Sequence, residues 1–190
     1  MSIAAFRARS HVGLGPRPGE IEAIEALGAE RWLTRQLADR PLPKALAPIP
    51  PSHVSLGEML AFQRARSRMR QNDEPGVMAA TDYLYATMMP QFQARLDAAI
   101  ATEDGFRERL VAFWSNHFTV STAGARLLIA TSCVAYENEA IRDRLDGSFA
   151  SMLKAVVQHP VMLAYMDNLD SFAVSSEMGR PAGRGVNENL

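Results

Sequence analysis

Apolar side chains recur every three or four residues along most of this chain, and no stretch alternates apolar and polar residues between hairpin turns. That period is typical of amphipathic helices and argues against half-buried strands. The sequence therefore predicts an all-α fold, an irregular multi-helix bundle with long Pro/Gly-containing connections and no sheet. The expected helices lie at about 21–27, 29–39, 55–71, 77–101, 103–118, 126–143, 148–158 and 160–168.

Proline and glycine residues separate these helices. Pro16, Pro18 and Gly19 precede the first helix, because proline suits a loop that leads into a first turn, and Gly28 interrupts it. Pro90 lies inside the expected helix 77–101, where the missing N–H should kink or split it. The cluster "RPLPKALAPIPPS" predicts a rigid surface connection.

The chain is long enough to bury one sizeable core. It has 190 residues, 47% of them hydrophobic, which predicts a single helical domain over 1–190. The tail "SSEMGRPAGRGVNENL" reaches Leu190 directly after the polar "NEN". We therefore expect this domain to be the N-terminal half of a longer one, and to need the remaining C-terminal part of the same protein.

Charge and cysteine content narrow the possible partners. The formal net charge is -1, so no global field favours nucleic acid or an anionic membrane. The cluster "QRARSRMR" spreads its four arginines around a helix, which predicts a solvated face rather than a nucleic-acid site. No segment has the length and apolarity of a membrane span or a signal peptide, which favours a cytoplasmic location. Cys133 is the single cysteine, so no intrachain disulfide can form, and we expect a buried core thiol.

The stretch "AFWSNHF" places His117 among large apolar side chains. At about 100° per residue, Phe106, Leu110, Phe113 and His117 form one stripe of a helix, so we expect His117 to point into the core. A buried imidazole needs a partner for each ring nitrogen. A structural histidine, a metal ligand and a general base all remain open.

Further polar residues lie near apolar helix faces. Asn116 is about a quarter-turn from His117, where it could bond a neighbouring helix or a ligand. In "YENEAIRDRLD", Glu137 lies on a different side from Glu139, and Glu139 can pair with Arg142 three residues later. That pair would be an exposed ion pair, a link between helices or a carboxylate positioned by a cation.

The end of the chain is rich in side chains that carry oxygen or nitrogen ligands. His159 precedes Pro160 at a helix junction, where we expect it to cap exposed carbonyls. Two explanations fit the Asp and Asn residues there equally well. One is turn formation and helix capping, and the other is binding of Ca²⁺ or Mg²⁺. The oxygen-bearing residues are Asp167, Asn168, Asn187, Glu188 and Asn189.

Several well-known signatures are missing from the sequence. "GLGPRPGE" has Pro18 where a dinucleotide fingerprint needs its third glycine. The chain contains no phosphate loop, no His-Glu-x-x-His, no Cys pair for zinc and no Gly-x-Ser-x-Gly elbow.

Four stretches resemble, in order, the large bacterial family known as domain of unknown function 1800 (DUF1800): "GLGPRPGE", "FRERLVAFWSNHFTVS", "YENEAIRDRLDGSFASMLKAVVQHPVMLAYMDN" and "NENL". The resemblance is strong over 106–168 and "NEN" and weak over 41–102, and "SHVGLG" departs from the Arg-Phe or similar pair of the family. It implies a truncated member and no mechanism, since the family has no established activity. The family's recurrent polar residues correspond here to Asn116, His117, Glu137, Arg142, His159, Asp167, Asn168, Asn187 and Glu188.

Two functions are compatible with these residues. The first is a polar, hydrolase-like site, in which either a bound divalent metal or a general base alone would assist the reaction. Its candidate catalytic residues are His117, Glu137, Asn116, Arg142 and His159, and its candidate metal ligands are His117, Asp167, Asn168 and Glu188. The second is a non-enzymatic helical binding or assembly module in which the same residues form a structural hydrogen-bond network. If the polar side chains converge beside an open pocket, the first function is favoured. If they form separate pairs in a sealed core, the second is favoured.

Overall fold

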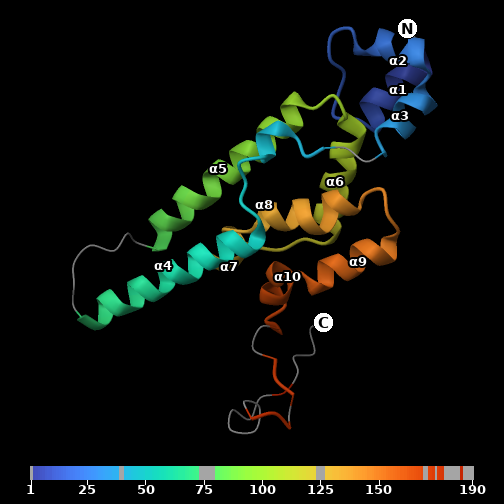
Figure 1. Cartoon of the computed structure of the whole chain (residues 1–190). Helices are drawn as coiled ribbons and strands as arrows, with labels where there is room; N and C mark the ends of the chain where they lie inside the picture. The colour runs from blue at the N-terminus through green and yellow to red at the C-terminus, as the bar shows by residue number, and fades with distance from the viewer. Residues whose placement is uncertain are drawn as a thin grey trace.

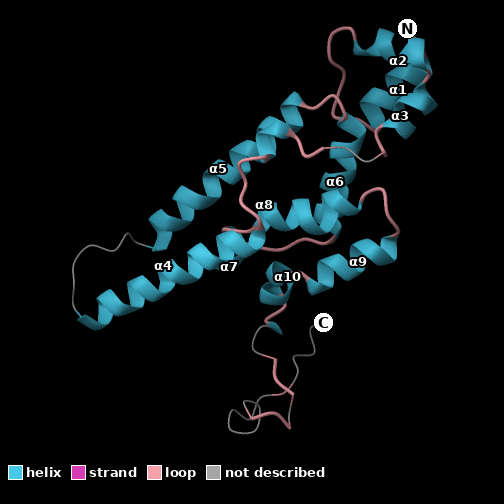
Figure 2. Ribbon diagram, in the orientation of Figure 1, coloured by secondary structure: helices cyan, strands magenta, loops and turns pink. Residues whose placement is uncertain are grey.

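The computed structural model describes residues 2–38, 41–72, 80–122, 127–168, 171–173, 175–177 and 185. Every regular element within these ranges is helical, which confirms the predicted all-α class (Figure 2). The α-helices are α1 (Ile3–His11), α2 (Glu20–Leu27), α3 (Ala29–Arg35), α4 (Ser52–Asn72), α5 (Ala80–Ala101), α6 (Gly105–His117), α7 (Leu127–Ala130), α8 (Cys133–Tyr136), α9 (Phe149–Gln158) and α10 (Pro160–Tyr165). The tighter or wider turns are η1 (Lys44–Leu46), the π-helical η2 (Glu137–Ile141) and η3 (Arg142–Arg144). Among the described helices, none combines the length and apolarity needed to cross a bilayer.

The helices form an irregular arrangement rather than parallel layers (Figure 1). The helices α1, α2 and α3 gather at one end, and the long helices α4 and α5 extend away from them. The helix α6 leads from the N-terminal group to the centre, where it contacts the π-helical turn η2. The helix α9 packs against η2 as well, and α10 contacts α7 and α9.

The N-terminal group packs around the buried side chains of Trp32 and Ile24. Gly28 has φ of 88° and lies between α2 and α3, so a residue without Cβ is required where the chain turns. Arg9 is also buried here, at 1% exposure, and its Nε lies 2.6 Å from Glu20 Oε2. The guanidinium of Arg9 stacks over the Trp32 ring.

The central segment, which we define as residues 133–144, is covered on one side by α9. Ser148 caps α9, because its hydroxyl accepts a backbone N–H from the first turn. Met152 and Val156 lie four residues apart on one face of α9 and join Ile141 of the central segment in a buried apolar cluster. A local cap and a helical period thus explain both the start and the orientation of α9.

Two expected helices differ from the structure. Pro90 does not split its helix, since α5 is continuous through it. A kink at Pro90 stays a prediction. The helix contacts η1 and α7, and such tertiary contacts offset the backbone donor that the proline removes. The helix expected over 126–143 is interrupted by a turn at Thr131 and Ser132, where the buried Ser132 hydroxyl lies 2.8 Å from the Ser55 hydroxyl.

Candidate functional site

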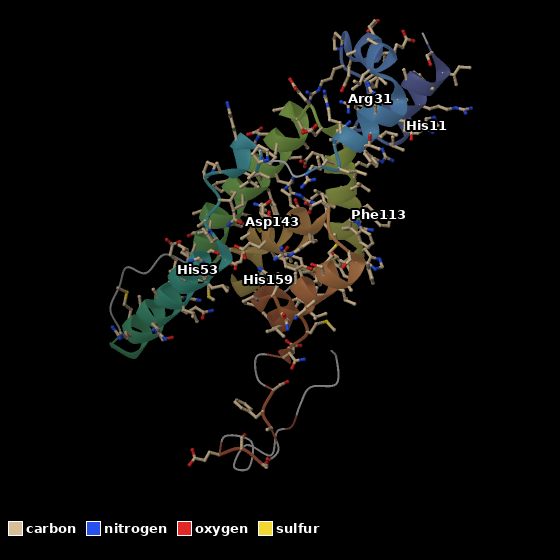
Figure 3. The ribbon with its side chains drawn as sticks, turned by 45° about the vertical axis from the view of Figure 1, so that its right-hand side comes forward. His11, Arg31, His53, Phe113, Asp143 and His159 are labelled. Atoms are coloured by element: carbon tan, nitrogen blue, oxygen red, sulfur yellow. The ribbon has the colours of Figure 1, made fainter. Side chains whose placement is uncertain are left out.

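His117 is exposed on the surface, so the prediction that it points into the core is wrong. Phe113 of the same stripe is 58% exposed and lies on the outer side of α6 (Figure 3). The ring of His117 packs edge-on against Trp114, with centroids 5.6 Å apart. The helix buries a different face, which carries Glu108 and Val111, because the central segment opposite presents charged groups.

The central segment is buried on almost all sides. Residues 134–138 and 140–142 are all buried, with α5 and α6 on one side and α9 on another. A helix enclosed in this way must provide a partner for each of its polar side chains. The turn Glu137–Ile141 is π-helical, and such wide turns are frequent at functional sites.

Arg142 and Glu108 form a buried ion pair between the central segment and α6. Their side chains are 4% and 7% exposed. Arg142 Nη2 donates to Glu108 Oε2 at 2.9 Å, Nη1 donates to the other carboxylate oxygen, and Nε donates to Asn138 Oδ1 at 3.2 Å. The pairing of Glu139 with Arg142 that the spacing allows does not form, because Glu108 supplies a bidentate partner.

Glu137 connects this pair to α5. Its Oε2 accepts from Ser115 Oγ at 3.0 Å and forms an ion pair with Arg95, whose Nη2 lies 2.8 Å away, and its Oε1 lies 3.8 Å from Arg142 Nη2. The Glu137 side chain is 7% exposed, whereas that of Arg95 is 43% exposed. Charges therefore alternate in sign from the buried Glu108 out to the half-exposed Arg95.

An open cavity of about 300 Å³ lies beside Glu137 and Arg95. We call it the Glu137 cavity; α5, α6, α8 and residues 119–122 line it. Its wall combines apolar groups with the hydroxyl of Ser115, the amide of Asn116 and the thiol of Cys133. Two predicted catalytic residues, Asn116 and Glu137, thus share one cavity, whose volume is at the lower end for ligand sites.

Cys133 is a half-buried thiol in the wall of this cavity. Burial and then the negative charge of Glu137 raise its pKa to about 11, against a smaller opposing effect of Arg95. The thiol is therefore protonated near neutral pH. The expectation of a buried core thiol holds only in part, because Cys133 packs against the apolar cluster of Leu46 and Ala98 but is half-buried and also lines the cavity.

Glu139 belongs to a separate network with α4 and the start of α10. It accepts from the backbone N–H of Ser52 at 2.7 Å, from the Ser52 hydroxyl at 2.6 Å and from His159 Nε2 at 2.9 Å. His159 Nδ1 accepts from the N–H of Val161 at 3.2 Å, so the ring hydrogen is on Nε2. The expectation that His159 caps carbonyls is therefore wrong: as N-cap of α10 it accepts an N–H.

The hydrogen bonds to Glu139 set its charge state. Burial alone would raise the pKa of this carboxyl, but the two bonds from Ser52, together with His159, outweigh burial and lower the pKa below its ordinary value. Glu139 is therefore ionised at neutral pH and holds α4, the central segment and α10 together. His159 takes part in this network and does not line the Glu137 cavity.

Three of the four predicted metal ligands, His117, Asp167 and Asn168, lie within the described residues. Asp167 is exposed, with φ of 55°, and Asn168 accepts a hydrogen bond from the hydroxyl of Ser171. Asn187, Glu188 and Asn189 lie outside the described residues. In the part of the chain that is described, no three His, Cys, Asp or Glu side chains are grouped to hold a metal ion. The ligand set that includes Glu188 stays a prediction.

Sequence analysis missed Arg95, Ser115, Glu108 and Ser52 as partners of the polar residues. Glu108 and Ser115 did have a signal, because they are seven residues apart and lie on one side of α6. Arg95 and Ser52 had none, since each meets its carboxylate only through tertiary packing.

Comparison with known proteins gives a family and no activity. The family described as "Protein of unknown function (DUF1800)" matches residues 7–190. No curated protein and no solved structure matches this chain.

Proposed function

This chain belongs to the DUF1800 family, whose description names no activity, and from that premise we propose that it is a helical ligand-binding module. Its site is the Glu137 cavity, and its ligand is a small organic acid. The observation that carries this proposal is Arg95, whose guanidinium is fixed by buried Glu137 and is still 43% exposed beside the cavity.

Arg95 is suited to bind a carboxylate. A guanidinium has five N–H donors in a planar fork, and Glu137 engages Nη2. The charge of Glu137 is also compensated by Arg142 and by the hydroxyl of Ser115, so Arg95 retains attraction for a second anion. The amide of Asn116 provides further hydrogen bonds for a polar ligand.

The same geometry supports binding better than hydrolysis. Hydrolysis through a covalent enzyme intermediate needs an activated nucleophile. The thiol of Cys133 in the cavity wall has a raised pKa, so it is protonated and not activated. His159 uses both ring nitrogens in another network, and His117 does not line the cavity. Three expectations stay predictions: metal-dependent hydrolysis that uses Glu188, a cytoplasmic location, and a requirement for the remaining C-terminal part of the same protein.

The test uses Cys133 as a reporter, because it is the single cysteine of the chain and lies in the cavity wall. The rate at which methyl methanethiosulfonate labels Cys133 is measured with and without malate, acetate or inorganic phosphate. We expect a carboxylate to slow labelling of the wild type. The Arg95→Gln variant should lose this protection, and Arg64→Gln on the exposed side of α4 should retain it.

Each variant is compared with itself, with and without the acid, since Arg95 also affects the pKa of Cys133. Equal protection by phosphate and by the carboxylates would identify a general anion site rather than an organic-acid site. No protection of the wild type by either carboxylate, or equal protection in Arg95→Gln, would refute the proposal.

A further inference from the structure

A second cavity, of about 470 Å³, lies along α5 on the side of the proline-rich connection. Tyr83, Thr87, Pro90, Ala94 and Asp97 line it, at spacings of four, three, four and three residues along one face of α5. Residues 45–50 form the opposite wall, and α4 completes it. We call it the α5 groove, and its lining is largely apolar.

Gln91 lines the α5 groove and carries an acceptor that is buried behind its wall and unpaired among the described residues. The side chain is 5% exposed, and its Nε2 donates to the carbonyls of Thr131 at 2.8 Å and Thr87 at 3.2 Å. Because both partners are carbonyls, the amide nitrogen faces them and Oε1 points away. Within the described residues Oε1 is buried without a hydrogen-bond partner. A buried acceptor of this kind calls for a donor.

The charge of the α5 groove is negative. Its lining residues include the carboxylates of Glu58 and Asp97 and no lysine, arginine or histidine. The field of Glu58 acts inside the groove, since burial and then Glu58 raise the pKa of the Tyr83 hydroxyl. Pro90 also has no N–H to give to the carbonyl of Ala86, and both residues line the groove.

From these observations we infer that the α5 groove binds a small aromatic amine. The ring lies between α5 and the proline-rich wall, where it leaves water. The ammonium group of the ligand pairs with the carboxylates of Glu58 and Asp97, which line the groove beside its apolar surface. This inference does not depend on the Glu137 cavity.

The experiment is isothermal titration calorimetry of the whole chain with tryptamine and, separately, indole-3-propionate. The two probes have the same ring and tether but carry opposite charges. We expect tryptamine to bind at least about tenfold more tightly. Ala86→Phe fills the groove from an exposed lining position and should weaken tryptamine binding, whereas Ala61→Phe, an exposed α4 position outside the groove, should not.

Glu58→Gln, at an exposed lining position, removes one of the two carboxylates and should weaken tryptamine binding too. Unchanged tryptamine binding in Arg95→Gln would separate this groove from the Glu137 cavity. No binding of tryptamine, equal binding of both probes by Arg95→Gln, in which the Glu137 cavity has lost its cation, or full binding of tryptamine by Ala86→Phe would each overturn the inference.

Discussion

Replacing Arg142 with methionine removes a guanidinium from a place where 4% of the side chain is exposed, and it keeps much of the apolar volume. The Glu108 carboxylate then loses both of its bonds to Arg142 while it remains 7% exposed. Asn138 Oδ1 loses the bond from Arg142 Nε. Glu137 is less affected, because it keeps its ion pair with Arg95 and the hydrogen bond from Ser115.

The expected magnitude follows from these lost contacts. Removing one partner of a buried ion pair costs about 3–5 kcal/mol, because a charge is left in a poorly solvating interior. The longer contact from Arg142 to Glu137, at 3.8 Å, should add little. Since a domain is stable by about 5–15 kcal/mol in total, this loss would be a large share of the free energy of unfolding.

A double variant separates the unpaired charge from other effects. Glu108→Leu combined with Arg142→Met removes both charges and leaves apolar groups in their place. Such replacements are often neutral or stabilising, so the double variant should regain most of the stability that Arg142→Met loses. The unsatisfied acceptor of Asn138 remains and should limit the recovery by about 1 kcal/mol or more.

The assay is urea unfolding followed by far-UV circular dichroism, with the free energy obtained by linear extrapolation. Arg144→Met is the matched control, because Arg144 lies in the same turn and is exposed. It should change stability by less than about 0.5 kcal/mol. The reasoning is refuted if Arg142→Met stays within about 1 kcal/mol of that control, or if the double variant is no more stable than the single one.

Three more predictions follow from the structure. Gly105→Ala should destabilise the protein by about 1–3 kcal/mol, since a Cβ there would overlap the buried guanidinium of Arg9. Gly57→Ala places its Cβ in open space and should stabilise α4 by about 0.5–1 kcal/mol. Urea unfolding measures both changes. Because the pKa of Glu139 is lower in the folded state, its contribution to the free energy of unfolding is complete above the ordinary carboxyl pKa and is lost as pH falls through the folded-state pKa. The free energy of unfolding should therefore fall less steeply with decreasing pH in Glu139→Gln than in the wild type. Methanethiosulfonate labelling of Cys133 should quicken as pH rises toward about 11, and Glu137→Gln should quicken it at pH near 8, because the thiol pKa falls; an unchanged rate would contradict this.

Several helices could be predicted because their signals are local. The expected helix 148–158 matches α9 closely, since both the Ser148 cap and the apolar period lie within the segment itself. The same holds for Gly28, whose left-handed backbone separates α2 from α3. Pro90 shows the limit of such signals, because α5 continues through a residue that removes one of its backbone donors.

The candidate site was predicted in part. Glu137 and Asn116 do line the Glu137 cavity, and Arg142 is one contact away from Glu137. The expected burial of His117 was wrong. A stripe of large apolar residues favours burial, but the segment that covers α6 presents charged groups and therefore packs against another face of the helix. His159 was placed correctly at a helix junction but with the opposite hydrogen-bonding role.

By itself the sequence determined that the chain is all helical, where most helices begin and end, and which polar residues lie among apolar ones, because these depend on neighbours a few positions away. Tertiary structure alone decided which face of α6 is buried and which partner each carboxylate has. Glu108 meets Arg142 across 34 positions, and Ser52 meets Glu139 across 87. A helical period reports the faces of one helix, whereas the group opposite each face depends on how the helices pack.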